Sequence, residues 1–213
     1  MSMYKMKVVK CGKCGKESEF KAWTLINAAQ NPEMKEAVRS GEVFTFTCPE
    51  CGAKTNMTRS LLYEEPEKNY MLWYAPEVVD EAYEKFEKQK KEIETNPKYE
   101  ALRGVEFTRR VVDRRIKFGE KLLILDLGLN DRIIEIMKVL IEEKAGKVYK
   151  EFLLNYTPDG KKNFAVKKED DSWATIPFDQ KLYDSLKDKA FERIDQFNNM
   201  VVGRAWARKV LDK

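Results

Sequence analysis

Four cysteines in two CxxCG motifs constrain this chain more than any other feature. Cys11 and Cys14 lie in CGKCG, Cys48 and Cys51 lie in CPECG, and the chain has no other cysteine. Two intervening residues allow a tight turn to point both sulfurs at one ion, and the following glycine lets backbone N–H groups face the sulfurs. Two such turns, here called knuckles, supply four thiolates, the tetrahedral set that zinc favours. The sequence therefore predicts a structural metal site for Zn2+, with Fe as the alternative because sulfur ligation alone does not separate the two.

The spacing between the knuckles predicts a ribbon with an insertion. The 33 residues between Cys14 and Cys48 exceed the usual spacing of a short zinc ribbon. A helix over residues 32–40, with Asn31 as its N-cap, accounts for the extra length. Segments 5–9 and 54–59 fit strands that bring the knuckles together. We expect a rubredoxin-like zinc ribbon with an inserted helix.

The rest of the chain predicts an α+β protein in three parts. Residues 1–76 form the zinc ribbon, residues 77–97 a charged helical linker, and residues 98–213 an α+β region of helices and a small antiparallel sheet. Within the last part, the hydrophobic periodicity favours a helix between Asn130 and Gly146. A hairpin is expected around Pro158-Asp159-Gly160.

Composition excludes several classes of function. Charged residues make up 36% of the chain with both signs mixed, and the net charge of +4 is modest for a dedicated nucleic-acid binder. The chain has no histidine, which removes histidine-based catalysis and histidine-containing zinc sites. The longest apolar stretch, residues 122–129, contains Asp126 and is too short to span a bilayer. We expect a cytoplasmic protein with no membrane partner.

Other candidate residues favour structural roles. A basic cluster could contact phosphates, but acidic residues interleave with it, and we expect a solvated face. Its members are Arg109, Arg110, Arg114, Arg115 and Lys117. The four tryptophans are expected in the core rather than as platforms for bases. No phosphate-binding glycine motif occurs. We therefore expect no catalytic residue, no cofactor beyond the metal, and no enzyme, because four protein ligands leave a zinc ion no open position.

The second knuckle and its surroundings resemble the CpXC family. The resemblance rests on the cysteines and on residues 20–27, 32–41, 46–47 and 61–63, and extends more weakly to residues 128–132 and the helix after them. Gly12 stands where the family name suggests proline, which loosens the first turn without changing the ligands. The resemblance implies a four-cysteine metal site at Cys11, Cys14, Cys48 and Cys51, and it implies no enzymatic activity.

These observations favour a metal-stabilised protein-interaction or scaffold module with a protein partner. A nucleic-acid-binding zinc ribbon is the first alternative, although the even charge distribution counts against it. A thiol redox switch, in which oxidation releases the metal and pairs the cysteines, is another. Iron in the site would indicate a rubredoxin-like electron carrier.

Overall fold

The chain folds into two compact units that both contain helices and strands, which confirms the α+β class. The computed structural model describes residues 2–77, 79–189, 194 and 200–212, and the units are Met1–Gly119 and Glu120–Lys213. This division differs from the three expected parts. Strand β7 (Thr108–Val112), expected in the C-terminal region, pairs with β6 (Tyr70–Tyr74) in the N-terminal sheet. No helix in the described part of the chain is long and apolar enough to cross a membrane.

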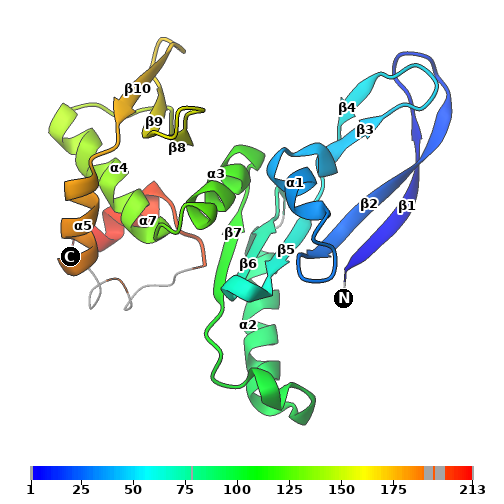
Figure 1. Cartoon of the computed structure of the whole chain (residues 1–213), viewed down its shortest axis with the longest axis horizontal. Coiled ribbons are helices and arrows are strands. Elements are labelled where there is room, and N and C mark those ends of the chain that lie inside the picture. Colours follow the sequence, from blue (N-terminus) through cyan, green and yellow to red (C-terminus); the bar gives the residue numbers. More distant parts are fainter. Residues whose placement is uncertain (1, 78, 190–193, 195–199, 213) are drawn as a thin grey trace. The chain divides into compact units, whose positions relative to one another are not determined.

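A five-stranded mixed sheet forms the centre of the N-terminal unit (Figure 1). Its strand order is β1 (Met3–Lys10), β2 (Glu17–Asn27), β5 (Leu61–Glu65), β6 (Tyr70–Tyr74) and β7. The β1–β2 and β5–β6 pairs are antiparallel, whereas β2–β5 and β6–β7 are parallel. The β5–β6 pair is a hairpin, with the 3-10 turn η2 (Pro66–Lys68) between its strands. Strands β1 and β2 extend beyond the other strands as a two-stranded ribbon (Figure 1).

The segment between β2 and β5 contains the inserted helix and a second, short hairpin. Helix α1 (Met34–Arg39) is followed by the 3-10 turn η1 (Glu42–Phe44), β3 (Thr45–Thr47) and β4 (Lys54–Asn56). The helix begins later than predicted, because the Met34 and Lys35 N–H groups bond to the carbonyls of Asn31 and Pro32 in a tight turn. Asn31 is not the cap, and its amide donates instead to the Glu33 carboxylate at 2.7 Å. Strand β4 is shorter than the strand predicted over residues 54–59, because it ends at Asn56.

Helix α2 (Val79–Thr95) confirms the charged helix expected in the linker. Its Phe86 contacts Trp73 of β6 edge to face, with ring centroids 5.3 Å apart. The 3-10 segment η3 (Pro97–Leu102) follows, and Asn96 caps it by accepting a hydrogen bond from the Lys98 N–H. The predicted linker helix therefore packs on the N-terminal sheet.

The C-terminal unit packs helices on a three-stranded antiparallel sheet. Helix α3 (Arg115–Asp126) contains the boundary between the units. It is followed by α4 (Asp131–Ala145), β8 (Glu151–Tyr156), β9 (Lys162–Lys167), β10 (Trp173–Pro177), α5 (Gln180–Lys189) and α7 (Arg204–Leu211). Asn130 caps α4 through the Arg132 N–H at 3.0 Å, and Gly146 ends it at φ 59°, as predicted. The core joins Ile133 and Met137 of α4 to aromatic side chains of the sheet.

Candidate metal centre

Each cysteine pair occupies the turn of a β-hairpin. Cys11 and Cys14 lie between β1 and β2, and Cys48 and Cys51 lie between β3 and β4. The short β3–β4 hairpin lies beside the far end of the β1–β2 ribbon (Figure 1). The two knuckles are 34 residues apart along the chain, and the insertion brings them together.

The two knuckles have the same backbone hydrogen bonds. In each, the N–H of the first cysteine donates to the carbonyl five residues later, at 2.8 Å for Lys16 and 2.9 Å for Ala53. The glycine N–H donates back to the carbonyl of the first cysteine at 2.9 Å in both. Gly15 and Gly52 have φ of 72° and 68°, a left-handed conformation that side chains with a Cβ rarely adopt. This geometry confirms the backbone bend predicted at these glycines.

The four sulfur atoms lie close enough together to hold one metal ion. All four Sγ atoms are within 4.8 Å of one another. The Cys11–Cys51 and Cys14–Cys48 pairs are 3.6 and 3.7 Å apart. A tetrahedron with zinc–sulfur bonds of about 2.3 Å has sulfur–sulfur edges of about 3.8 Å. A disulfide bond would need about 2.05 Å. The donor set therefore fits a four-thiolate metal site.

The knuckle backbone and the neighbouring thiols shift the pKa values of two cysteines in opposite directions. Hydrogen bonds from the Cys14 and Lys13 N–H groups lower the pKa of Cys11 to about 6. The Lys16 N–H lowers the pKa of Cys14, but burial and the thiols of Cys51, Cys11 and Cys48 raise it to about 12. One thiol of the group thus ionises readily, and its charge opposes ionisation of the next. A divalent cation would offset this repulsion and keep all four deprotonated.

A small apolar cluster supports one side of the metal centre. Cys11 and Cys48 are buried with Phe46, and the partly buried Val9, Phe20, Ala53 and Met57 pack against them. The Phe20 and Phe46 rings meet edge to face, with centroids 5.9 Å apart. Cys14 is exposed and Cys51 is intermediate. The site is therefore covered on the side of the aromatic pair and reaches the surface at Cys14.

Arg59 is a supporting residue that sequence reasoning missed. Its guanidinium donates to the Trp23 carbonyl of β2 and, at 2.5 Å, to the Val43 carbonyl of η1. The same group lies 5.5 Å from the Phe20 ring centroid and 5.6 Å from that of Phe44. Burial lowers the pKa of Arg59. The side chain joins the ribbon to the segment that leads into the second knuckle, a link that no local sequence pattern indicates.

The predicted basic cluster makes contacts within the N-terminal unit. The Arg109 guanidinium lies over the Phe107 ring, the Arg115 guanidinium lies over Phe44 at 5.1 Å, and Lys117 pairs with Asp113 at 4.0 Å. The expected solvated face is wrong for Arg110, which is buried. These contacts give Arg109, Arg115 and Lys117 structural roles.

The prediction that the tryptophans are core residues holds for two of the four. Trp23 and Trp206 are buried, and Trp73 is partly buried. Trp173, on β10, is 53% exposed, so the prediction is wrong there. It lies at one end of β10, opposite Lys167 of β9. Its flat ring therefore faces solvent beside a charged side chain.

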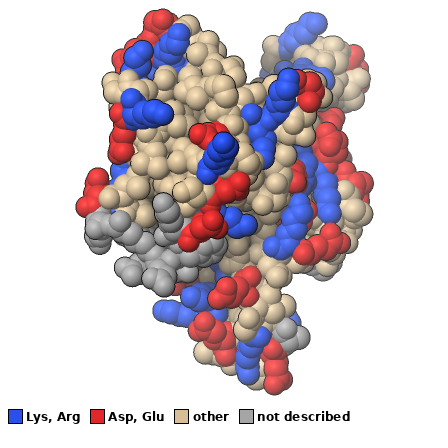
Figure 2. All heavy atoms as spheres, turned by 60° about the vertical axis from the view of Figure 1, so that its left-hand side comes forward, with Lys and Arg blue, Asp and Glu red and all other residues tan. Residues whose placement is uncertain are grey.

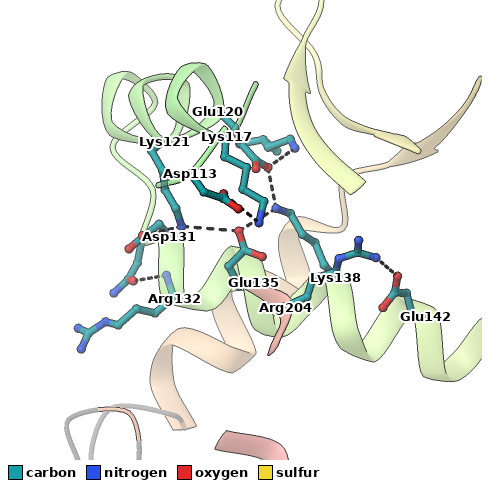
Figure 3. Close-up of polar contacts among 12 residues, drawn as sticks. Asp113, Lys117, Glu120, Lys121, Asp131, Arg132, Glu135, Lys138, Glu142 and Arg204 are labelled. Carbon is teal, nitrogen blue, oxygen red and sulfur yellow. Dashed lines mark hydrogen bonds and ion pairs between the residues drawn. The ribbon is translucent and has the colours of Figure 1, made fainter. Parts of the chain in front are cut away.

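A second cluster of ionisable residues lies inside the C-terminal unit (Figure 3). Lys138 pairs with Glu120 at 2.7 Å and with Glu135 at 2.9 Å. Lys121 pairs with Asp131 at 2.8 Å and with Glu135 at 3.6 Å. All five residues are buried. The Lys138–Glu135 pair lies within α4, but the other three pairs join α3 to α4, and the sequence indicated only that these residues lie on helices.

The pKa values in this network follow from burial and from the lysines. Burial raises the pKa of Glu120 above its ordinary value, although Lys138 acts against it. Burial also raises that of Glu135, but Lys138 and Lys121 outweigh it and lower the pKa overall. Glu120 further accepts the Leu154 N–H of edge strand β8 at 2.6 Å. Each buried charge has partners, so the network serves to hold α3, α4 and β8 together.

One comparison with known proteins identifies a family. The family model described as CpXC protein matches residues 9–138, well over half of the chain and all four cysteines. The match extends beyond residues 9–75, which carried most of the resemblance, through α3 and into α4. No curated protein and no solved structure matches the chain. The chain therefore belongs to the CpXC family.

Proposed function

We propose that this chain is a zinc-stabilised protein-interaction module without catalytic activity. The observation that carries the proposal is the pair of equivalent knuckles, which hold four sulfurs at spacings that suit tetrahedral zinc. Four thiolate ligands would complete the coordination of the ion and leave no position for water or substrate. The ion would act as a structural link between two hairpins, in the manner of a rubredoxin-like ribbon.

The metal is proposed to hold a β surface in a binding-competent form. Two-stranded hairpins are marginally stable by themselves in water. Strands β3 and β4 have three residues each, and Phe46 is the buried apolar side chain they provide. Linking this hairpin to the end of the β1–β2 ribbon would fix both. A partner would then meet an ordered surface, which lowers the entropic cost of association.

The distribution of charge favours a protein partner over nucleic acid. On the face drawn in Figure 2, lysine and arginine side chains alternate with acidic ones, and no broad patch of one sign covers it. Nucleic-acid binding relies on clustered cations that neutralise phosphates. Three of the five cations in the predicted basic cluster, Arg109, Arg115 and Lys117, contact aromatic rings or a carboxylate, as described above.

The experiment is affinity capture from native lysate with matched metal-loaded and metal-free baits. The bait is purified without a polyhistidine tag, and its metal is measured by elemental analysis. We expect one zinc per chain and a stoichiometric protein partner that the Cys48→Ser bait fails to retain. One iron per chain would instead support electron transfer. Salt-sensitive retention on heparin with no protein partner would support nucleic-acid binding and contradict the proposal.

A further inference from the structure

The outer edge of strand β1 is open for pairing. In the part of the chain that the structure describes, β1 ends the five-stranded sheet and pairs with β2 alone. An open edge presents a row of backbone N–H and C=O groups to any extended segment. The strand is eight residues long and mostly exposed, so a partner strand has room for several ladder hydrogen bonds.

The two faces of β1 differ in chemistry. Tyr4, Met6 and Val8 alternate along one face and are 50%, 52% and 67% exposed. The register places Tyr4 opposite Trp23 and Met6 opposite Lys21 of β2. The Lys21 ammonium lies 4.1 Å from the Tyr4 ring centroid and 4.2 Å from that of Trp23, which orders one end of this apolar row.

The opposite face of β1 is basic. Lys5 and Lys7 alternate with the apolar row, and their cross-strand neighbours are Ala22 and Phe20. Neither lysine forms an ion pair among the residues that the structure describes. The whole strand contains three lysines and no acidic residue. These charges are available to a strand that lies along the open edge.

The lysines also oppose pairing between two copies of the chain. Two copies of β1 could pair antiparallel about a twofold axis perpendicular to the sheet, with their apolar rows on the same face. Each residue would then lie opposite a residue whose number is the same or differs by an even number. The central registers place Lys5 opposite Lys5, Lys5 opposite Lys7, or Lys7 opposite Lys7. Like charges directly opposite each other destabilise a strand pair, and edge lysines are a common protection against such pairing.

We propose that the β1 edge binds an extended segment of another protein in which apolar and acidic residues alternate. The apolar side chains of the segment would cover Tyr4, Met6 and Val8, and its carboxylates would face Lys5 and Lys7. Backbone pairing supplies affinity and the alternating side chains supply specificity. This inference rests on the proposed interaction function, since the first knuckle directly follows β1 and would fix the end of the strand.

The probe is a ten-residue peptide of alternating valine and glutamate, tested on the zinc-loaded full chain. We expect amide chemical-shift changes concentrated on residues 3–10 and a dissociation constant that rises with salt. The same peptide with lysine for glutamate should not bind. The Lys5→Glu/Lys7→Glu variant should weaken binding about tenfold or more, as expected for two reversed charge pairs.

Matched variants test the apolar row. Val8→Asp should weaken binding about fivefold or more, whereas Val148→Asp, at a comparably exposed valine of the C-terminal unit (61%), should not. Zinc content and circular dichroism report whether each variant is folded. Equal binding by the wild-type chain and both β1 variants would overturn the proposal.

Two further outcomes separate this inference from the proposed function. If the Lys5→Glu/Lys7→Glu bait still captures the lysate partner in full, the interaction function stands and the β1 edge is refuted. If light scattering shows a dimer that Val8→Asp converts to monomers, the edge pairs two copies, and the acidic segment is refuted. If neither the peptide nor any lysate protein binds the zinc-loaded chain, both proposals fail.

Discussion

Serine substitution at Cys14 and at Cys48 should have equal effects if the four thiols bind one ion. The two residues differ in exposure, since Cys48 is 1% exposed and Cys14 lies on the surface. If packing alone mattered, a buried hydroxyl at Cys48 would cost about 1–3 kcal/mol. The same change at exposed Cys14 would stay within about 0.5 kcal/mol. Metal ligation predicts a large and similar loss at both positions.

The size of that loss follows from how little else supports the β3–β4 hairpin. Between residues 45 and 57, Phe46 and Cys48 are the buried residues. Burying Phe46 contributes about 1.5–3 kcal/mol, and its edge contact with Phe20 adds about 1 kcal/mol. Ordering the backbone costs on the order of 1 kcal/mol for each residue. A structural zinc contributes roughly 10–16 kcal/mol in small zinc domains, so either variant should unfold the hairpin.

Hydrogen exchange with mass spectrometry measures this directly. Peptides that cover residues 11–16 and 45–57 should lose protection in both variants, and elemental analysis should find less than one zinc per chain. Peptides from α4 in the C-terminal unit should exchange as in the wild type. Thr47→Ser, at an exposed neighbour of Cys48, is the control and should keep zinc and protection. Metal ligation by four thiols is refuted if Cys14→Ser keeps its zinc and its exchange protection while Cys48→Ser loses its zinc and its protection.

Three further predictions test supporting features. Gly52→Ala should cost about 1 kcal/mol of hairpin stability in hydrogen exchange, because φ is 68° and only conformational strain opposes the new Cβ; Gly12→Ala should cost far less. Lys138→Met should destabilise the C-terminal unit by about 3–5 kcal/mol in denaturant melts, because two buried carboxylates lose their shared cation; an unchanged midpoint would contradict this. Burial raises the pKa of Glu65, but hydrogen bonds from neighbouring side chains outweigh it and lower the pKa overall. Its stabilising contribution is therefore present above the unfolded-state pKa and is lost as pH falls through the folded value. Glu65 pairs with Arg39 and with Lys68, each at 3.1 Å. Glu65→Gln should flatten the acid side of the profile of stability against pH, and an unaltered profile would show that these ion pairs contribute nothing.

Local signals predicted several elements because each rests on residues close together in sequence. Helix α4 has its cap at Asn130, its end at Gly146 and a strong apolar period, and all three appear as predicted. The β8–β9 hairpin also forms as expected. The predicted start of α1 was wrong because the carbonyls of Asn31 and Pro32 accept backbone hydrogen bonds in a turn that precedes the helix.

The sequence by itself determined the four candidate ligands and their family, because the spacing within each knuckle is a local property of five residues. Only the tertiary structure decided what depends on distant pairing. Parallel pairing of β7 with β6 places Thr108–Val112 in the N-terminal sheet, and the N-terminal unit extends to Gly119, beyond residue 98, where the C-terminal region was expected to begin. The buried positions of Lys121 on α3 and Lys138 on α4 likewise became visible only in the structure. Burial and ion pairing depend on which helix faces meet, and that information is spread over the whole chain.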